Sequence, residues 1–110
     1  MIRAEFSVSE QKVRGFTISG HAGLAPSGSD VLCAAVSAMA LLTVNTLREV
    51  FGVRFDLIER DGFLSLTLSD VPKDSRKSAD GVLRGLMLQL QDLCLQYPER
   101  ISVHIIDKEG

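Results

Sequence analysis

Apolar and polar residues alternate in the first part of the chain. Residues 2–8 are apolar at every second position, which is the period of a half-buried β-strand. After a polar break, a second strand is expected over 12–19. Within it Val13 is out of phase with Phe16, which predicts a β-bulge near Gly15. The two strands are expected to pair as a hairpin.

Two longer segments have helical spacing. The first begins after a possible N-cap at 29–30, extends over 31–51 and ends at Gly52. Its first turns are apolar or small nearly all round, so it must be buried on more than one side, against a second helix or a partner subunit. The second helix covers 76–97, with apolar residues at i, i+3, i+4 and i+7, and stops before Pro98.

The remaining apolar runs predict three strands, over 53–58, 63–69 and 101–105. The first two are joined through Asp61-Gly62, a dipeptide typical of tight hairpin turns. The order ββαββαβ then indicates an α+β protein, a mixed sheet with both helices packed on one face. No linker or repeat divides the chain, so residues 1–110 are expected to form a single domain.

Composition narrows the class of protein. The 110 residues are 45% hydrophobic and 24% charged, which is ordinary for a folded domain. The formal net charge is -2, the basic residues are scattered along the chain, and aromatic residues make up only 5% of it. Direct nucleic-acid binding is therefore not expected, because it requires a basic face and aromatic stacking surface.

Three features bear on the compartment. The two cysteines are too few for a disulfide framework, and the chain opens directly with a strand pattern instead of a secretion signal. The longest apolar stretch, 31–44, is interrupted by Ser37 and Thr43 and falls short of the ~20 residues that span a bilayer. We expect a cytoplasmic protein with no membrane partner.

One segment carries candidate chemistry. With Asp30 as N-cap, Cys33 lies in the first helical turn, where free N–H groups and the helix dipole favour a thiolate. If Cys33 attacks a carbonyl, the same N–H groups are candidates to stabilise the oxyanion. His21, twelve residues earlier across a loop, could fold back to act as base and acid, and Gly20 and Gly23 would let the backbone turn around its imidazole. The residues alone leave another interpretation open, because a cysteine in an Ala-rich helix is more often a core residue.

The other reactive side chains are expected to have structural roles. Asp30 is expected to cap the helix, with orientation of His21 as the alternative. Cys94 falls on the apolar face of the second helix and is expected in the core. His104 is given no role. No spacing of Cys, His, Asp and Glu suggests a metal site and no phosphate loop is present, so no cofactor is expected.

The motif Gly20-His21-Ala22-Gly23, followed by Gly28-x-Asp30-Val-Leu-Cys33-Ala-Ala-Val-Ser37-Ala, resembles the signature of the ribosomal-processing cysteine protease Prp family. The resemblance covers the whole chain in length and element order. It implies a homodimeric cytoplasmic protease that removes a short N-terminal extension from a protein of the large ribosomal subunit. The target carries paired aromatic residues just before the cleavage point.

The same resemblance assigns roles to residues. It implies that Cys33 is the nucleophile, that His21 is the general base and acid, and that Asp30 assists. The loop expected to close over the substrate includes Gly20, Ala22, Gly23 and Gly28. Two rivals remain, a non-catalytic ribosome-assembly or protein-interaction module, and another thiol enzyme such as an acyl transferase.

Overall fold

The computed structural model describes residues 1–23, 25–26 and 30–108. It contains β1 (Ile2–Ser9), β2 (Lys12–Ser19), α1 (Val31–Asn45), β3 (Arg54–Arg60), β4 (Phe63–Asp70), α2 (Arg76–Gln96) and β5 (Ile101–Asp107). A π-helical turn, Thr46–Val50, continues α1, and a 3-10 turn, Lys73–Ser75, precedes α2. Each strand and helix expected from the sequence is present, in the expected order.

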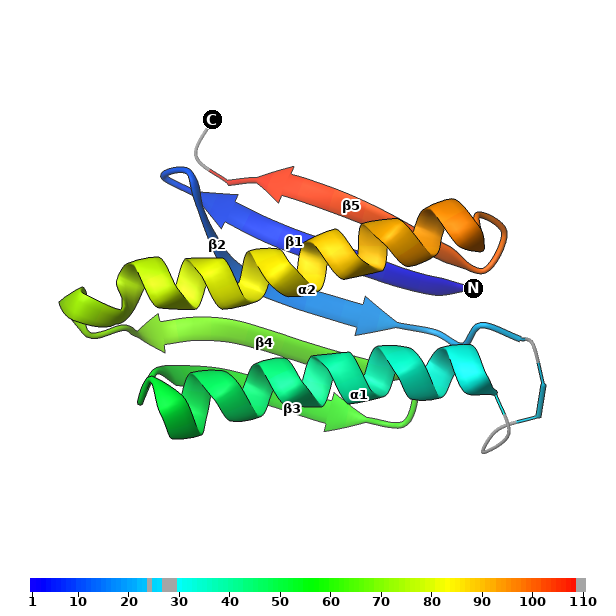
Figure 1. Ribbon diagram of the computed structural model, residues 1–110, viewed down its shortest axis with the longest axis horizontal. Coiled ribbons are helices and arrows are strands. Elements are labelled where there is room, and N and C mark those ends of the chain that lie inside the picture. Colours follow the sequence, from blue (N-terminus) through cyan, green and yellow to red (C-terminus); the bar gives the residue numbers. More distant parts are fainter. Residues whose placement is uncertain (24, 27–29, 109–110) are drawn as a thin grey trace.

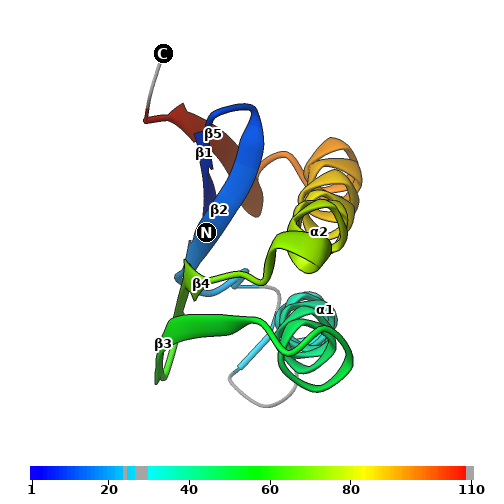
Figure 2. The same ribbon diagram turned by 90° about the vertical axis from the view of Figure 1, so that its left-hand side faces the viewer.

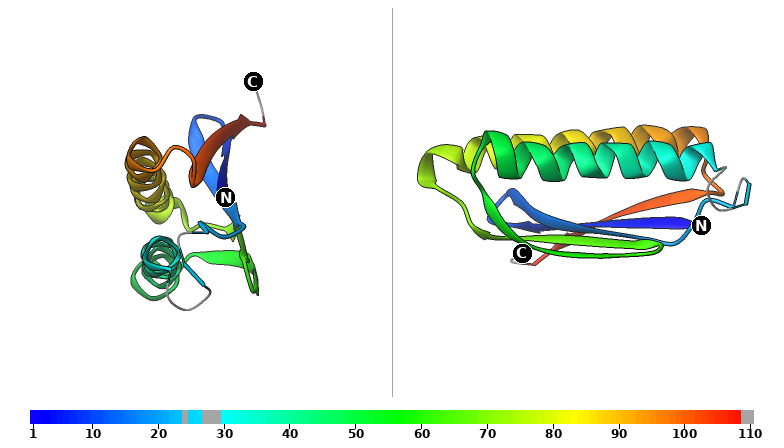
Figure 3. Two further views of the ribbon diagram at one scale, coloured as in Figure 1. Left: turned by 90° about the vertical axis from the view of Figure 1, so that its right-hand side faces the viewer. Right: turned by 90° about the horizontal axis from the view of Figure 1, so that it is seen from below.

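The strands form one five-stranded sheet in the order β3-β4-β2-β1-β5. The β1–β5 pair is parallel, and the other three pairs are antiparallel. Both helices lie on the same face of the sheet, with α1 over its β3–β4 side and α2 beside it (Figures 1 and 2). Seen from below, the helices form one layer and the sheet another (Figure 3). The α+β class and the mixed sheet with helices on one face are confirmed.

The bulge expected in β2 is present. Ser7 faces Gly15 and Val8 faces Val13, so Arg14 is the extra residue on the second strand. The extra residue restores Val13 to the buried face, where its side chain is 1% exposed. The out-of-phase apolar position in the sequence is therefore explained by the register shift.

Helix α1 buries one side against the sheet and α2. The buried residues of α1 are Leu32, Val36, Ala40, Thr43 and Val44. Leu47, in the π-helical turn that follows, is buried as well. The opposite side is also apolar but open, with Val31 74% and Leu42 66% exposed. The helical stretch 31–50 has 20 residues, and an 18-residue window within it has a mean hydropathy of 1.6. It is longer than the apolar stretch expected, and long and apolar enough to cross a membrane by length and composition. In this fold the helix instead contributes its buried side to the core.

Chain segments that are distant in sequence meet at one end of the sheet. The end of β2, the start of α1, the β3–β4 turn and the start of β5 all lie there, close to the N-terminus (Figure 1). Backbone hydrogen bonds connect them: Gly20 donates to the carbonyl of Gly62, and Ile2 donates to that of Arg100, both at 2.8 Å. The segment with candidate chemistry is thus anchored among three other parts of the fold.

Candidate active site

The start of α1 is fixed by Asp30, which is 6% exposed. Its Oδ1 accepts the backbone N–H groups of Leu32 and Cys33, each at 3.0 Å, and its carbonyl accepts the N–H of Ala34 at 3.0 Å. The extended backbone of Asp30, with φ -82° and ψ 106°, is that of an N-cap. The capping role expected from the sequence is confirmed.

The sulfur of Cys33 lies beside the segment that follows β2. Cys33 is half-buried, and its Sγ accepts the backbone N–H of Ala22 at 3.3 Å. Ala22 is itself only 1% exposed. An N–H directed at sulfur stabilises the thiolate, because hydrogen bonds are stronger when the acceptor carries charge. The position therefore combines a helix N-terminus with a hydrogen-bond donor.

His21 is held by the turn between β3 and β4. A Cβ built on Gly62 would lie 2.7 Å from Nε2 of His21 and 3.3 Å from its Cε1, so the imidazole packs directly on the Gly62 backbone. The hydrogen bond from Gly20 N–H to the Gly62 carbonyl fixes the same two segments. The Asp61-Gly62 pair predicted the turn in the sequence, but nothing in it indicated that the turn supports His21.

A cavity of about 370 Å³ brings these residues together. His21 and Cys33 both line it, and so does Asp30. Among the hydrogen bonds of the described residues, none joins the imidazole of His21 to the sulfur of Cys33. Active-site hydrogen bonds are often long before substrate binds, so a shared cavity is the relevant geometry.

The cavity has both apolar and charged lining. The apolar residues come from the sheet and from α1, and include Ile2, Ile18, Val36, Ala40, Leu41 and Leu64. Glu59, Arg60 and Asp61, beside the β3–β4 turn, supply charged groups. From Cys33 to Leu41 it follows α1 for eight residues, or about 12 Å at the rise of an α-helix. An extended peptide of three or four residues has that length.

The first residues of the expected substrate loop have defined surroundings. A Cβ on Gly20 would lie 2.1 Å from the carbonyl oxygen of Met1, so only glycine fits there. The Nη1 atom of Arg100 donates to the carbonyls of Ala22 and Gly23, at 3.2 and 3.0 Å. Arg100 was not among the residues indicated by the sequence. Gly28, assigned to the same loop, lies outside the described residues.

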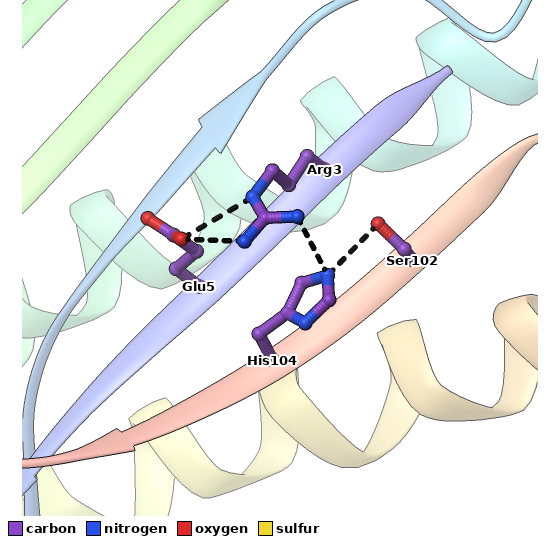
Figure 4. Close-up of polar contacts among 4 residues, drawn as sticks. All are labelled: Arg3, Glu5, Ser102 and His104. Atoms are coloured by element: carbon purple, nitrogen blue, oxygen red, sulfur yellow. Dashed lines mark hydrogen bonds and ion pairs between the residues drawn. The ribbon is translucent and has the colours of Figure 1, made fainter.

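The second histidine is on the other side of the sheet. Nε2 of His104 lies 3.0 Å from Nη1 of Arg3 and 3.2 Å from Oγ of Ser102, and Arg3 also pairs with Glu5 (Figure 4). Because a guanidinium can only donate, Nε2 of His104 is the acceptor in its contact with Arg3. Cys94, the second thiol, is half-buried on α2 and packs against the core. Neither residue lines the cavity that holds Cys33.

Within residues 1–23, 25–26 and 30–108, no group of three or more His, Cys, Asp and Glu side chains is placed to hold a metal ion. The cavity is lined by a thiol and an imidazole, those of Cys33 and His21, and this is a side-chain pair that serves nucleophilic catalysis.

Most of the chain matches a known family of proteins. A family model described as cysteine protease Prp covers residues 1–102. The chain belongs to the Prp family of cysteine proteases. Membership decides in favour of an enzyme over the non-catalytic module that the sequence left as a rival.

Relatives of this Prp-family chain match it along nearly their full length. The ribosomal processing cysteine protease Prp of Bacillus subtilis (strain 168) is 26% identical over 107 residues, which cover 94% of this chain and 96% of the relative. The structure of the essential ribosomal processing protease Prp from S. aureus, in complex with a covalently linked product peptide, has a TM-score of 0.85 at 27% identity, covering 96% of this chain and 99% of that one.

A further solved structure has the same architecture. SMU.848 from Streptococcus mutans has a TM-score of 0.81 at 27% identity, with 98% of this chain and 96% of that chain covered. The fold is therefore that of solved Prp-family structures.

Proposed function

We propose that this Prp-family enzyme removes a short N-terminal extension from a large-subunit ribosomal protein, using Cys33 as nucleophile and His21 as general base and acid. The observation that carries this proposal is the single cavity lined by both side chains, with the Ala22 N–H directed at the sulfur. The relatives from Bacillus subtilis and S. aureus are ribosomal processing proteases, which supports the choice of substrate.

The reaction follows from the two side chains. His21 takes the thiol proton of Cys33, and the thiolate attacks the carbonyl carbon of the scissile peptide bond, forming a C–S bond and an oxyanion. When the oxyanion collapses, the C–N bond breaks and the imidazolium of His21 gives its proton to the leaving amine. His21 then accepts a proton from water, whose oxygen attacks the thioester carbon. The C–S bond breaks, the acid is released, and the imidazolium returns its proton to the Cys33 sulfur.

The oxyanion needs a donor other than those first expected. The sequence suggested backbone N–H groups at the start of α1, but those of Leu32, Cys33 and Ala34 are already bound to Asp30. The N–H of Ala22 is the donor beside Sγ. Because the oxyanion forms one bond away from the carbon attached to sulfur, Ala22 N–H is within reach of it after a small shift.

The shape of the cavity supports a peptide substrate. Its length along α1 accommodates three or four extended residues, and its apolar lining suits the paired aromatic side chains implied by the family resemblance. A small-molecule acyl transferase would need only the part of the cavity next to Cys33. The extended cavity therefore favours the protease over this second thiol enzyme.

Dimerisation and location complete the proposal. Val31, Ala35, Ala38 and Leu42 form an exposed apolar stripe on the outer side of α1, and a second copy of the chain would cover it. The enzyme would act in the cytoplasm, where ribosomal proteins are made. Both of its cysteines are free thiols in the structure.

Peptide cleavage tests the proposed function. A peptide with paired aromatic residues before the expected cleavage point should be cut by the wild type, and cleavage should be lost in Cys33→Ala and in His21→Ala. Cys94→Ala and His104→Ala are matched controls, because their side chains lie away from the cavity, and both should retain activity. Full activity in Cys33→Ala, or none in the wild type with any such peptide, would contradict the proposal.

A further inference from the structure

Arg100 lies at the turn between α2 and β5, 67 positions after Cys33 in the sequence, and it reaches the segment beside the thiol. Its Nη1 atom donates to the carbonyls of Ala22 and Gly23 at 3.2 and 3.0 Å. It is the same residue, Ala22, whose N–H donates to the sulfur of Cys33 at 3.3 Å. Arg100 therefore binds the carbonyl of Ala22, while the N–H of the same residue faces the sulfur of Cys33.

The backbone of Arg100 is itself held by hydrogen bonds. Its backbone N–H donates to the carbonyl of Tyr97 at 2.9 Å, and its own carbonyl accepts the N–H of Ile2 at 2.8 Å. The next residue, Ile101, is fully buried. With its backbone held in this way, Arg100 can move only by rotation about its side-chain bonds. Its guanidinium can therefore keep Ala22 in position relative to the sheet.

We infer that Arg100 is a positioning residue for the nucleophile: by binding the carbonyls of Ala22 and Gly23 it fixes the backbone on the C-terminal side of Ala22, and so the direction in which the Ala22 N–H points, toward Sγ of Cys33. The charged guanidinium makes stronger hydrogen bonds to carbonyls than a neutral donor would. With Ala22 fixed, the donor stabilises the thiolate before substrate arrives and is in place for the oxyanion afterwards. Arg100 acts through Ala22 and touches no reacting atom.

This inference deepens the proposed function, because it takes Cys33 as the nucleophile. It predicts that loss of the guanidinium lowers thiol reactivity at Cys33 selectively. The packed thiol of Cys94 has no link to Arg100 among the described contacts and serves as an internal reference in the same molecule.

Alkylation by iodoacetamide, located by mass spectrometry across a pH series, tests the inference. In Arg100→Ala the labelling ratio of Cys33 to Cys94 at neutral pH should fall about tenfold, the effect of losing one hydrogen bond to a charged group. The pH needed to label Cys33 should rise. Arg100→Lys keeps a cation with N–H donors and should bring the ratio back to within about threefold of the wild type.

Arg84→Ala is the matched control. Arg84 also donates to a backbone carbonyl, that of Gln11 at 2.7 Å, and pairs with Asp80, but it does so at the β1–β2 turn. This variant should lose stability without changing the labelling ratio. If Arg100→Ala behaves like Arg84→Ala, or if Arg100→Lys shows no recovery, the inference is wrong.

The test separates the inference from the proposed function. Labelling reads the state of the thiol and needs no substrate, whereas peptide cleavage reads proteolysis. A wild type that labels selectively but cuts no peptide would contradict the proposed substrate and leave the role of Arg100 intact. A wild type that cuts the peptide, with an unchanged ratio in Arg100→Ala, would overturn the inference alone.

Discussion

The imidazole of His21 rests on the backbone of Gly62, close enough that a Cβ at position 62 would lie 2.7 Å from Nε2. Gly62→Ala should therefore displace the ring from its place in the cavity, and a shift of about 1 Å in a catalytic group can cost a hundredfold in rate. We expect peptide cleavage to fall by about 10- to 100-fold. Steady-state cleavage of the paired-aromatic peptide measures it.

Gly52→Ala provides the control for this substitution. Gly52 has φ +60°, similar to +67° at Gly62, but a Cβ there would meet nothing within 4 Å. Both variants bear the same backbone strain, of about 1 kcal/mol or more. Equal losses of activity in the two variants would show that strain, and not the contact with His21, is responsible.

Thiol reactivity should depend on His21. In the wild type, Cys33 should react with iodoacetamide faster than Cys94 near neutral pH, because the Ala22 N–H directed at its sulfur favours the thiolate. His21→Ala should slow the labelling of Cys33 and leave that of Cys94 unchanged. His104→Ala, on the far side of the sheet, should change neither rate. Similar labelling of both thiols in the wild type would argue against an activated Cys33.

Substitutions of Asp30 can distinguish its capping of α1 from a part in catalysis. Asp30→Asn keeps an oxygen that can accept the N–H groups of Leu32 and Cys33, so thermal stability should be retained. Asp30→Ala removes the acceptor and should destabilise the protein by about 1–2 kcal/mol, measured by thermal unfolding. We expect Asp30→Asn to retain cleavage. An inactive but stable Asp30→Asn would instead assign Asp30 a part in catalysis.

The outer side of α1 should form the subunit contact. Light scattering of the wild type should give about twice the chain mass of 12.0 kDa. Leu42→Glu places a charge at a position that is 66% exposed in the single chain and should yield monomers. Leu95→Glu is the control, since Leu95 is 82% exposed on α2. A monomeric wild type, or a dimeric Leu42→Glu variant, would exclude this contact.

The β1–β2 turn offers a prediction on stability alone. Glu10 and Gln11 have φ of 54° and 65°. Two-residue hairpin turns with such left-handed values favour Asn followed by Gly. The double substitution Glu10→Asn, Gln11→Gly should stabilise the fold by about 1 kcal/mol and raise the melting temperature by about 4–8 °C. Calorimetry measures this shift, and peptide cleavage should not change because the turn is remote from the cavity.

Local patterns were enough to predict the elements and the start of α1. Alternation defined the strands, Val13 signalled the bulge, and Asp30 capped the helix that carries Cys33, because each of these signals involves residues close in sequence. The residues around the thiol were predicted in part. His21 and Cys33 share the cavity, but the N–H groups expected for the oxyanion are taken up by the cap.

Gly62 and Arg100 could not be found in the same way. They meet the candidate site through contacts with His21 and Ala22, across 41 and 78 positions of sequence. No periodicity or motif encodes such a pairing. It arises only when the β3–β4 turn and the start of β5 come to the same end of the sheet, which depends on strand order.

The parallel pairing of β5 with β1 joins the last strand of the chain to the first. Arg100 directly precedes β5, so its bonds to Ala22 and Gly23 can form only after nearly the whole chain has been synthesised and the last strand has docked. A shorter or half-folded chain would contain His21 and Cys33 but lack the anchored N–H beside the sulfur. The role inferred for Arg100 thus makes completion of folding a condition for full reactivity of the Cys33 thiol.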